Sequence, residues 1–299
     1  MKKGPGLLAI IMCLALISSC AVHQSRTKSS VVDYLYPKTE TIVQPSVPVL
    51  TIPVSVGIAF VPEQGRTNNN NRGLWPGLGG AGITESQKNE LLEKIAENFR
   101  KYEFVGSIEV IPSAYLTSGG SFSNLEQIKT MYNIDVIALV SYDQVQFTDE
   151  GLLSLTYWTV VGAYVVNGEK NDTSTMLDTV VMDINSRKML FRAPGTSDIK
   201  GSSTLINLSE KLRIDRLNGF TEATDKMIVN LDQQLSSFKE KIKAKPEQVK
   251  ITYSPGYSGA SGSGGGGLFN LIEAGILFLL LLSSIQRKKS FRACKTRAG

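Results

Sequence analysis

Hydrophobic positions in the first third of the chain follow strand spacing and helix spacing in turn. Residues 54–61 are almost continuously apolar, as expected for a strand buried on both faces. Thr84 and Gln87 form a capping-box pattern, and the apolar residues that follow recur at helical spacing to about Lys101. Residues 105–111 again have the composition of a strand. The pattern therefore predicts a strand, a helix and a second strand.

The middle of the chain predicts a shorter helix followed by several strands. Ser123 and Glu126 repeat the capping-box pattern ahead of apolar residues at helical spacing. A strand is expected from Ile134, with alternation that continues through Phe147. Long alternating strands joined by short polar turns indicate an antiparallel run. Further strands are expected at residues 152–166, 175–184 and 188–192, with a turn at 167–172 and a polar loop at 195–202.

A long helical stripe, from about residue 204 to 243, ends the central part of the chain, and Pro246 closes it. This order of elements predicts an α/β (α+β) fold within residues 51–246, with one mixed, largely antiparallel sheet covered by two to three helices. The element order and the strand within residues 133–146 (NIDVIALVSYDQVQ) resemble the small domain of several periplasmic lipoproteins, such as the curli-secretion lipoprotein. Fold similarity of this kind does not carry a function.

The beginning of the chain has the pattern of an export signal. Lys2 and Lys3 precede a short apolar run that ends at Cys20, which is typical of a secretory signal peptide at residues 1–19. Ile17, Ser18 and Ser19 before Cys20 resemble the bacterial lipobox. This resemblance implies that lipoprotein-processing enzymes cleave before Cys20 and attach membrane lipid to it, which gives stable anchoring. Ala21 in place of an aspartate favours the outer membrane in such lipoproteins.

Two polar segments are expected to connect the body to the ends of the chain. Residues 20–50 contain several prolines and predict a lipidated tether with little structure of its own. Residues 247–267 predict a Gly/Ser-rich linker.

The end of the chain predicts a membrane span. Residues 268–285 form an almost unbroken apolar run, which as a helix would be about 27 Å long, close to the thickness of a bilayer. A basic cluster in residues 286–299 then predicts a cytoplasmic tail, so the Gly-rich side faces outward. The topology signal consists of Arg287, Lys288, Lys289 and Arg292.

The Gly-rich run before this span has the composition expected of a protease-processing region, because glycine favours an easily extended backbone. Its residues are Gly262, Ser263, Gly264, Gly265, Gly266 and Gly267. A Gly-rich stretch, an apolar span and a basic terminus in this order resemble the sorting tail cut by rhombosortases, which are rhomboid-type intramembrane proteases. A lipobox and such a tail on one chain resemble the rhombotail (rhombosortase-target) lipoproteins of Gram-negative bacteria. A plain C-terminal anchor behind a linker is the alternative.

Charge and residue types exclude several classes of function. The leader contributes +2 and the residues from 268 onward +5 to a net charge of +5, so the body is slightly acidic, at −2. A body of this charge gives no basic surface for nucleic acid. The single histidine, His23, lies in the predicted tether, and the body contains no cysteine, which excludes histidine triads and cysteine nucleophiles. We therefore expect no enzyme activity and no cofactor.

Acidic residues and glycines in the body offer weaker possibilities. Asp135 and Asp143 lie eight residues apart on one predicted strand, about 27 Å, too far for an acid/base pair. Asp143 and Asp183, with Asp149 and Glu150, could approach the geometry of an oxygen-ligand metal site, although a solvated rim is the simpler interpretation. The glycines in residues 77–82 lack the lysine and spacing of a phosphate-binding loop.

Two hypotheses follow for the whole chain. The first is a non-enzymatic envelope lipoprotein that faces the periplasm, at the outer membrane or cell surface after processing, with a body that binds a protein partner or another envelope component. The second is a self-assembling subunit of an envelope or secretion complex, with the C-terminal helix as a permanent anchor. A hydrolase without histidine is the least favoured class.

Overall fold

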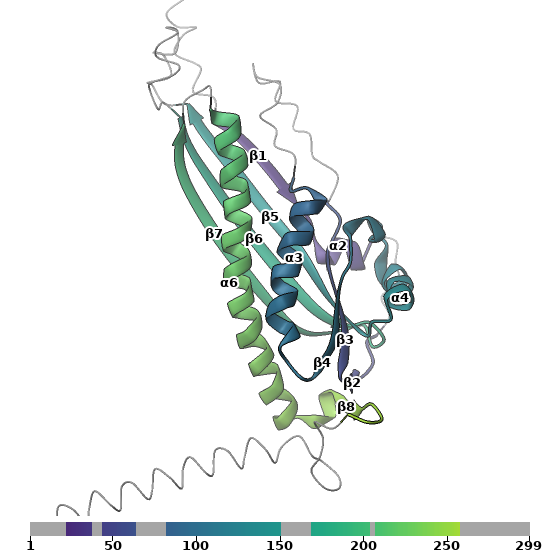
Figure 1. Ribbon diagram of the computed structural model, residues 1–299. Helices are drawn as coiled ribbons and strands as arrows, with labels where there is room; N and C mark the ends of the chain where they lie inside the picture. Colours follow the sequence, from purple (N-terminus) through teal and green to yellow (C-terminus); the bar gives the residue numbers. More distant parts are fainter. Residues whose placement is uncertain (1–21, 38–43, 64–81, 151–168, 204–206, 258–299) are drawn as a thin grey trace, which may run out of the picture. The chain divides into compact units, whose positions relative to one another are not determined.

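The computed structural model describes residues 22–37, 44–63, 82–150, 169–203 and 207–257. The chain divides into two units, Met1–Thr252 and Tyr253–Gly299, and the sheet and helices described below belong to the first. In its mixed sheet, β3 is parallel to a neighbour on each side, β4 and β5, while the later strands add in antiparallel order (Figure 1). Along the sheet the strands are β4 (Val105–Val110), β3 (Val54–Phe60), β5 (Val136–Glu150), β6 (Glu169–Asp183) and β7 (Lys188–Ser203).

Strand β1 (Val22–Lys28) fills the part of the β5 edge that β3 leaves open. It pairs with Asp143–Asp149 of β5 in antiparallel register, whereas β3 pairs with the earlier part, from Val136 to Val140. Because β6 occupies the other edge of β5 along its whole length, β1 and β3 lie end to end on the same edge. Residues 22–37 were expected to be tether, but they form this strand and the short helix α2 (Val31–Leu35).

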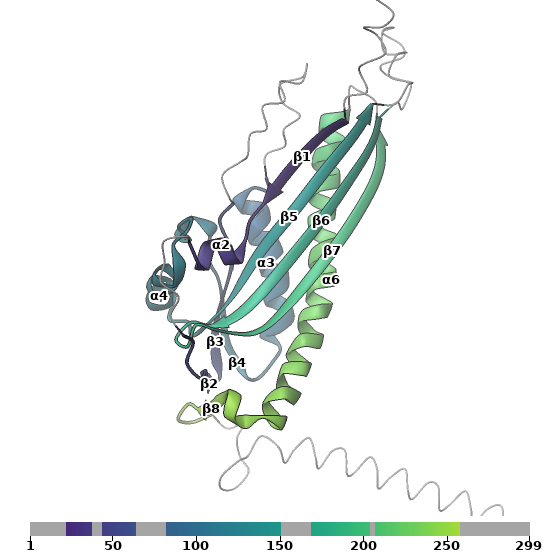
Figure 2. The ribbon, with the colours of Figure 1, turned by 180° about the vertical axis from the view of Figure 1, so that it is seen from behind.

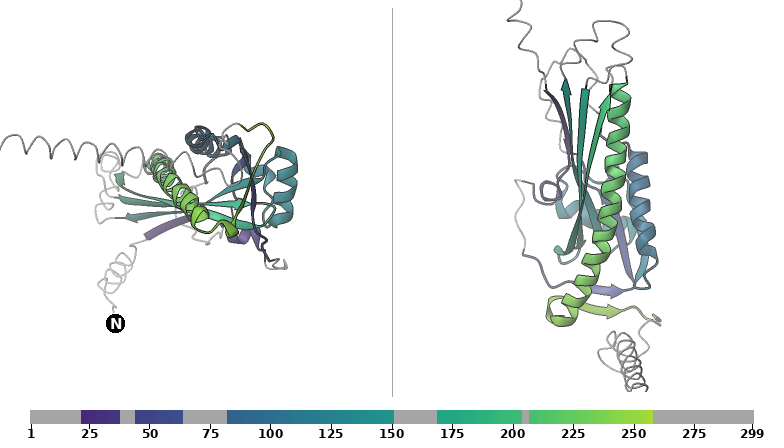
Figure 3. Two further views of the ribbon diagram at one scale, coloured as in Figure 1. Left: turned by 90° about the horizontal axis from the view of Figure 1, so that it is seen from below. Right: turned by 90° about the vertical axis from the view of Figure 1, so that its left-hand side faces the viewer.

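Helices cover the sheet unevenly. Figures 1 and 2 show α3 (Glu85–Arg100) and α6 (Leu208–Ala244) on one face and α2 with α4 (Ser121–Tyr132) on the other. Helix α3 connects β3 to β4 on one face and α4 connects β4 to β5 on the other, so two successive connections lie on opposite faces of the sheet. The right-hand view of Figure 3 shows α6 running along the sheet, and its 37 residues correspond to about 55 Å.

The apolar core lies beneath α2 and α4. Residues of both helices and of β3, β5 and β6 pack into one buried cluster, in which Leu125, Ile137 and Leu139 are fully covered. At the start of the cluster, the Tyr34 hydroxyl donates to Asn124 Oδ1 at 2.8 Å, which fixes α2 against α4. This packing stabilises the segment after β1, because Tyr34 and Leu35 are 3% and 2% exposed and belong to the buried cluster.

The N-terminal half of α6 packs on a polar face of the sheet. Gln144 and Gln146 of β5 are buried and donate to the Arg216 and Leu212 carbonyls of the helix, at 3.1 and 2.9 Å. Gln146 Nε2 also donates to Thr173 Oγ1 of β6 at 3.1 Å. Hydrogen bonds therefore add to the burial of Leu208 and Leu212 in the first turns of the helix, while Phe220, Met227 and Leu231 supply apolar contacts farther along.

The predictions for the central elements hold with shifted boundaries. The α+β class, the mixed sheet and its covering helices are confirmed, and so is the capping box at Thr84 and Gln87. The predicted cap at Ser123 is wrong, because the N-cap of α4 is Gly120, three residues earlier. The predicted loop at 195–202 is part of β7, and the end of the predicted turn is part of β6.

Short elements complete the described chain: η1 (Ser113–Tyr115), η3 (Pro246–Gln248), and the pair β2 (Val49–Ile52) and β8 (Lys250–Tyr253).

The structure does not support the predicted C-terminal transmembrane helix. Its residues, 268–285, lie outside the described ranges, as do the basic tail and the predicted strand at 152–166. Within the ranges that the structure describes, no helix combines the length and apolar character needed to cross a bilayer. The apolar run alone therefore does not establish a membrane span.

Candidate functional site

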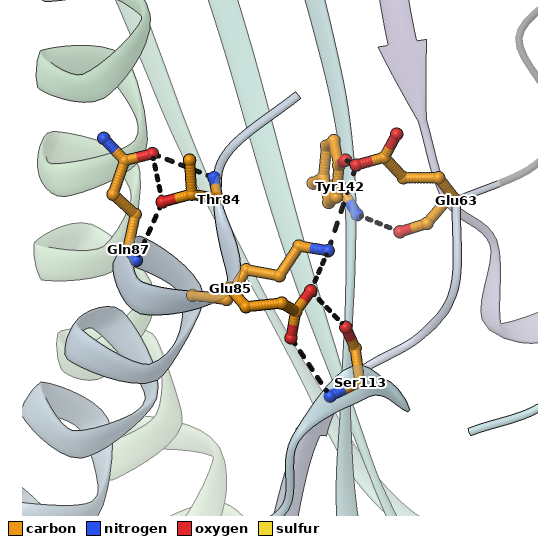
Figure 4. A network of polar contacts seen from close by, with 8 residues as sticks. Glu63, Thr84, Glu85, Gln87, Ser113 and Tyr142 are labelled. Atoms are coloured by element: carbon orange, nitrogen blue, oxygen red, sulfur yellow. Dashed lines mark hydrogen bonds and ion pairs between the residues drawn. The ribbon is translucent and has the colours of Figure 1, made fainter. Parts of the chain in front are cut away.

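The carboxyl ends of two parallel strands and the first turn of α3 meet at one place on the sheet. Glu63 follows β3, Ser113 follows β4, and Glu85 and Lys88 belong to the start of α3 (Figure 4). In open sheets with parallel strands, ligands bind beyond the carboxyl ends of the strands, where successive connections leave toward opposite sides. We call Glu63, Glu85, Lys88, Ser113 and Tyr142 the switch-point network.

Lys88 is the cation at the centre of this network. Only 6% of the residue is exposed, and its Nζ lies 2.9 Å from Glu85 Oε1 and 3.9 Å from Glu63 Oε1. A buried ammonium requires such partners, because removal of a charge from water is unfavourable unless it is paired. The two carboxylates outnumber the single ammonium, so the network carries a formal charge of −1.

Tyr142 connects the network to the core of the sheet. Its hydroxyl donates a short hydrogen bond to Glu63 Oε1, while its backbone N–H donates to Ser29 Oγ at 3.1 Å. The ring is 1% exposed and makes edge contacts with Phe60 and Phe220, at centroid distances of 6.1 and 5.2 Å. Glu63 is thus held by a side chain that the core itself fixes.

Glu85 joins α3 to the end of β4. Its carboxylate accepts hydrogen bonds from the Ser113 hydroxyl and, at 3.3 Å, from the Ser113 backbone N–H. Burial works to raise the pKa of Glu85, but the hydrogen bonds from Ser113 and Lys88, with the Lys88 charge, outweigh it and hold the pKa below its ordinary value. The carboxylate is therefore the favoured form of this residue in the folded protein.

The network connects the end of β3, the start of α3 and the end of β4, and it does not have the arrangement of a nucleophilic site. The Ser113 hydroxyl donates to a carboxylate that also accepts a hydrogen bond from Lys88, and the lowered pKa of this carboxylate makes it a weak base toward the hydroxyl. Glu63 and Gly82 flank residues 64–81, and a Cβ on Gly82 would lie 2.4 Å from Glu63 Oε1. The network therefore fixes the points at which that segment leaves and rejoins the described fold.

The residues that the sequence singled out as functional lie elsewhere. The lipobox with Cys20, the Gly-rich run and the basic cluster are all outside the described ranges. Asp135 accepts a hydrogen bond from Lys129 at 3.2 Å, and Asp143 forms an ion pair with Arg26.

The suggested grouping of Asp143 with Asp183 does not form. The register pairs Asp143 with Met176, seven residues or about 23 Å from Asp183 along β6. Asp183 is fully buried and accepts from the Ser186 backbone N–H at 2.9 Å, so it belongs to the turn before β7 and not to a solvated rim. Among the described side chains, no cluster of three metal-binding residues occurs.

Sequence reasoning missed the switch-point network. The capping box at Thr84 places Glu85 and Lys88 at the start of a helix, so the sequence carried a signal for two of the five network residues. The contacts with Glu63, Ser113 and Tyr142 join residues 25 to 79 positions apart, and only the fold brings them together.

Comparisons with known proteins assign no family to the chain. No protein-family model and no curated protein sequence matches it. Among solved structures, it is similar to a PelC dodecamer from Paraburkholderia phytofirmans, with 12% identity over 71% of this chain and 95% of that chain and a TM-score of 0.26. It is also similar to a neuraminyllactose-binding hemagglutinin homologue from Helicobacter pylori, with 10% identity over 71% of this chain and 97% of that chain and a TM-score of 0.34.

A third similar structure is a DUF330 protein from Xanthomonas campestris, with 11% identity over 66% of this chain and 99% of that chain and a TM-score of 0.30. With TM-scores below 0.5, these similarities decide neither fold family nor function. Membership of the rhombotail lipoproteins stays a prediction.

Proposed function

We propose that this chain is a non-enzymatic bacterial envelope lipoprotein, lipidated at Cys20, whose α+β body is a binding module. The lipobox pattern at Ile17, Ser18, Ser19 and Cys20, behind a signal-peptide pattern, is the observation that carries the proposal. The body then faces the periplasm, most simply from the outer membrane, because Ala21 follows the cysteine.

The body of the protein is compatible with a role in binding. The charged groups at the switch point form ion pairs and hydrogen bonds in which both carboxylates and the ammonium have partners. Glu63 and Gly82, which flank residues 64–81, lie at the end of the sheet where ligands bind in open sheets with parallel strands. Loops held on a rigid scaffold are where recognition is concentrated.

Lipidation is tested with the full chain expressed in a Gram-negative host. Labelled palmitate should enter the wild-type protein and not the Cys20→Ala variant, and the wild-type mass should correspond to an acylated chain that begins at Cys20. Cys13→Ala, which changes a cysteine within the leader, is the matched control and should keep the label. A wild-type protein that retains Met1 and carries no acyl group would refute the proposal.

Cleavage at the Gly-rich run is the second part of the proposal. The composition of residues 262–267 supports it, because a run of glycines offers the extended backbone that a protease requires. Mass spectrometry of the native protein should show a C-terminus within or next to this run when a rhomboid-type protease is present. A mass that includes Gly299 would contradict it.

Assembly into a complex is the second candidate. Strand β7 pairs with β6 on one edge, and among the described residues no strand pairs with its other edge. Pro194 and the charged residues Arg192 and Lys200 on this strand oppose strand addition. Light scattering on residues 21–257 distinguishes the candidates: a monomer at high concentration favours the binding module, and a defined oligomer favours assembly.

A further inference from the structure

The lipid-bearing cysteine and the folded sheet are separated by one residue. Strand β1 begins at Val22, so only Ala21 lies between it and Cys20. Two residues span at most about 7 Å even when fully extended. If Cys20 carries the lipid, as in the proposed function on which this inference rests, the acyl chains hold that end of the sheet at the membrane surface.

The register of the sheet shows which residues share this end. Val22 pairs with Asp149, Asp149 with Lys170, and Lys170 with Ser202, so one row crosses four strands. The first turn of α6, from Leu208, lies at the same end of the sheet (Figures 1 and 3). We call this row the anchor row.

The opposite end of the sheet lies far from the anchor row. Along β7, Ser202 and Met189 are 13 residues apart, which corresponds to roughly 43 Å at the rise of a strand. Tyr142 of the switch-point network is seven residues from Asp149 along β5, or about 23 Å. Because the strands are paired throughout this length, the sheet is a rigid spacer and not a flexible tether.

We propose that the anchor row lies against the lipid surface, and that the sheet stands away from it with the turn between β6 and β7 farthest from the membrane. The partner of the anchor row is thus a lipid bilayer. A lipoprotein with a long flexible tether would sample all orientations, whereas this chain has a strand in place of most of that tether. The switch-point network is then presented to partners at a fixed height above the lipid.

The test uses two positions on the same strand. In a Cys294→Ser background, Ser202→Cys or Met189→Cys is labelled with a fluorophore on the full chain that a Gram-negative host has processed. Both native side chains are exposed, so labelling should leave the fold intact. The protein is placed in vesicles of phosphatidylethanolamine and phosphatidylglycerol (about 3:1) that contain a headgroup nitroxide quencher, whose range is on the order of 10 Å.

Quenching at position 202 should exceed quenching at position 189 by at least about threefold. A matched variant with a ten-residue Gly/Ser insertion after Ala21 should lose most of this difference, because the insertion restores a flexible tether. Circular dichroism of each labelled protein confirms that it is folded.

Equal quenching at the two positions, or stronger quenching at 189, in protein whose mass confirms acylation would overturn the orientation and leave the lipoprotein proposal intact. A mass without acyl chains would overturn the lipoprotein proposal itself, and the orientation with it.

Discussion

At the scale of single residues, Gly195 permits the closest approach between α6 and the sheet. A Cβ at this position would lie 2.1 Å from the Ala223 carbonyl oxygen and 2.7 Å from the Met227 backbone nitrogen. These are backbone atoms of a packed helix, so they cannot move aside cheaply. Gly195→Ala should therefore lower the free energy of unfolding by about 2–3 kcal/mol, measured as a shift of the urea midpoint.

Gly201→Ala is the matched control, because Gly201 lies on the same strand and also faces α6. The nearest atoms to its added Cβ are Asp215 Oδ2 at 3.1 Å and the flexible Lys211 Cε at 3.2 Å. These contacts can relax by a few tenths of an ångström, so the loss should stay below about 1 kcal/mol. Equal losses for the two variants would show that the helix does not approach β7 as closely as described.

Glu85 should make stability depend on pH in the acid range. The hydrogen bonds that lower its folded pKa, against burial, mean that the unfolded chain binds this proton more readily. Its contribution is therefore complete above the ordinary pKa of 4.5 and is lost as the pH falls through the lower folded value. Glu85→Gln should be less stable than wild type at pH 7, by at most about 1 kcal/mol because the side chain is half exposed.

The difference between Glu85→Gln and wild type should narrow as the pH falls below 4.5, and urea unfolding at a series of pH values measures it. Glu97→Gln, at an exposed position of the same helix, is the control and should follow the wild-type curve. A difference that stays constant from pH 7 to pH 3 would mean that the Glu85 carboxylate is not what holds Ser113 and Lys88.

At the scale of elements, the two capping-box patterns of the sequence have different outcomes. Thr84 accepts from the Gln87 backbone N–H, and Gln87 accepts from the Thr84 N–H, so both halves of the first box form. Ser123 lies inside α4, where its hydroxyl donates to the Gly120 carbonyl at 3.0 Å. The same residue pattern thus caps α3 and lies within the first turn of α4.

Thr84→Ala should destabilise the protein by about 1 kcal/mol, because it leaves N-terminal amides of α3 without an acceptor. Ser123→Ala, chosen to match it in chemistry, should change stability by less than about 0.5 kcal/mol, since alanine is a better helix former than serine. Thermal and urea unfolding of the two variants measure both values. A larger loss for Ser123→Ala would mean that α4 starts where the sequence pattern placed it.

Periodicity predicted those elements whose buried side is apolar. Strand β3, helix α3 and strand β4 were found within one or two residues of their observed ends. The second half of β7 was predicted as a loop, because the side that faces α6 carries Gly195, Ser197, Gly201 and Ser203, with Ile199 as its one large apolar residue. Where a helix approaches a strand closely, small residues replace hydrophobic ones and the signal disappears.

Buried polar residues between the sheet and α6 also make the strands difficult to predict from the sequence. Gln144, Gln146, Thr173 and Thr175 are all buried under α6, and hydrogen bonds between them and to the helix satisfy much of their polarity. A hydropathy pattern treats such residues as solvent-exposed. The pattern therefore predicts shorter strands than the structure shows, at residues 175–184 and 188–192 in place of β6 and β7.

At the scale of the whole molecule, the sequence and the structure inform different parts of the chain. The predicted signals for export and processing are patterns at the two ends, in residues 1–20 and 262–299, and depend on local residue types alone. The switch-point network depends on contacts between β3, α3, β4 and β5, which no local pattern encodes. The first kind of feature can be predicted from one sequence, and the second requires the fold.

Strand β1 connects these two parts, and its removal tests whether it belongs to the fold. A protein that begins at Ser29 should be less stable than one that begins at Ala21, by about 2–4 kcal/mol, if each lost pairing of β1 with β5 contributes roughly 0.5 kcal/mol net. Hydrogen exchange should increase at Asp143–Asp149, which lose their partner, and not at Val136–Val140, which pair with β3.

Arg26→Ala provides the control for this deletion. It removes the exposed ion pair with Asp143 but keeps the strand, so it should lower stability by no more than about 1 kcal/mol and leave exchange at the β5 edge unchanged. If the deletion has an effect as small as Arg26→Ala, β1 is dispensable and its residues act as part of the tether predicted from composition over residues 20–50. If the full loss is observed, the strand next to Cys20 belongs to the folded body, and a lipid on that cysteine must hold the sheet directly.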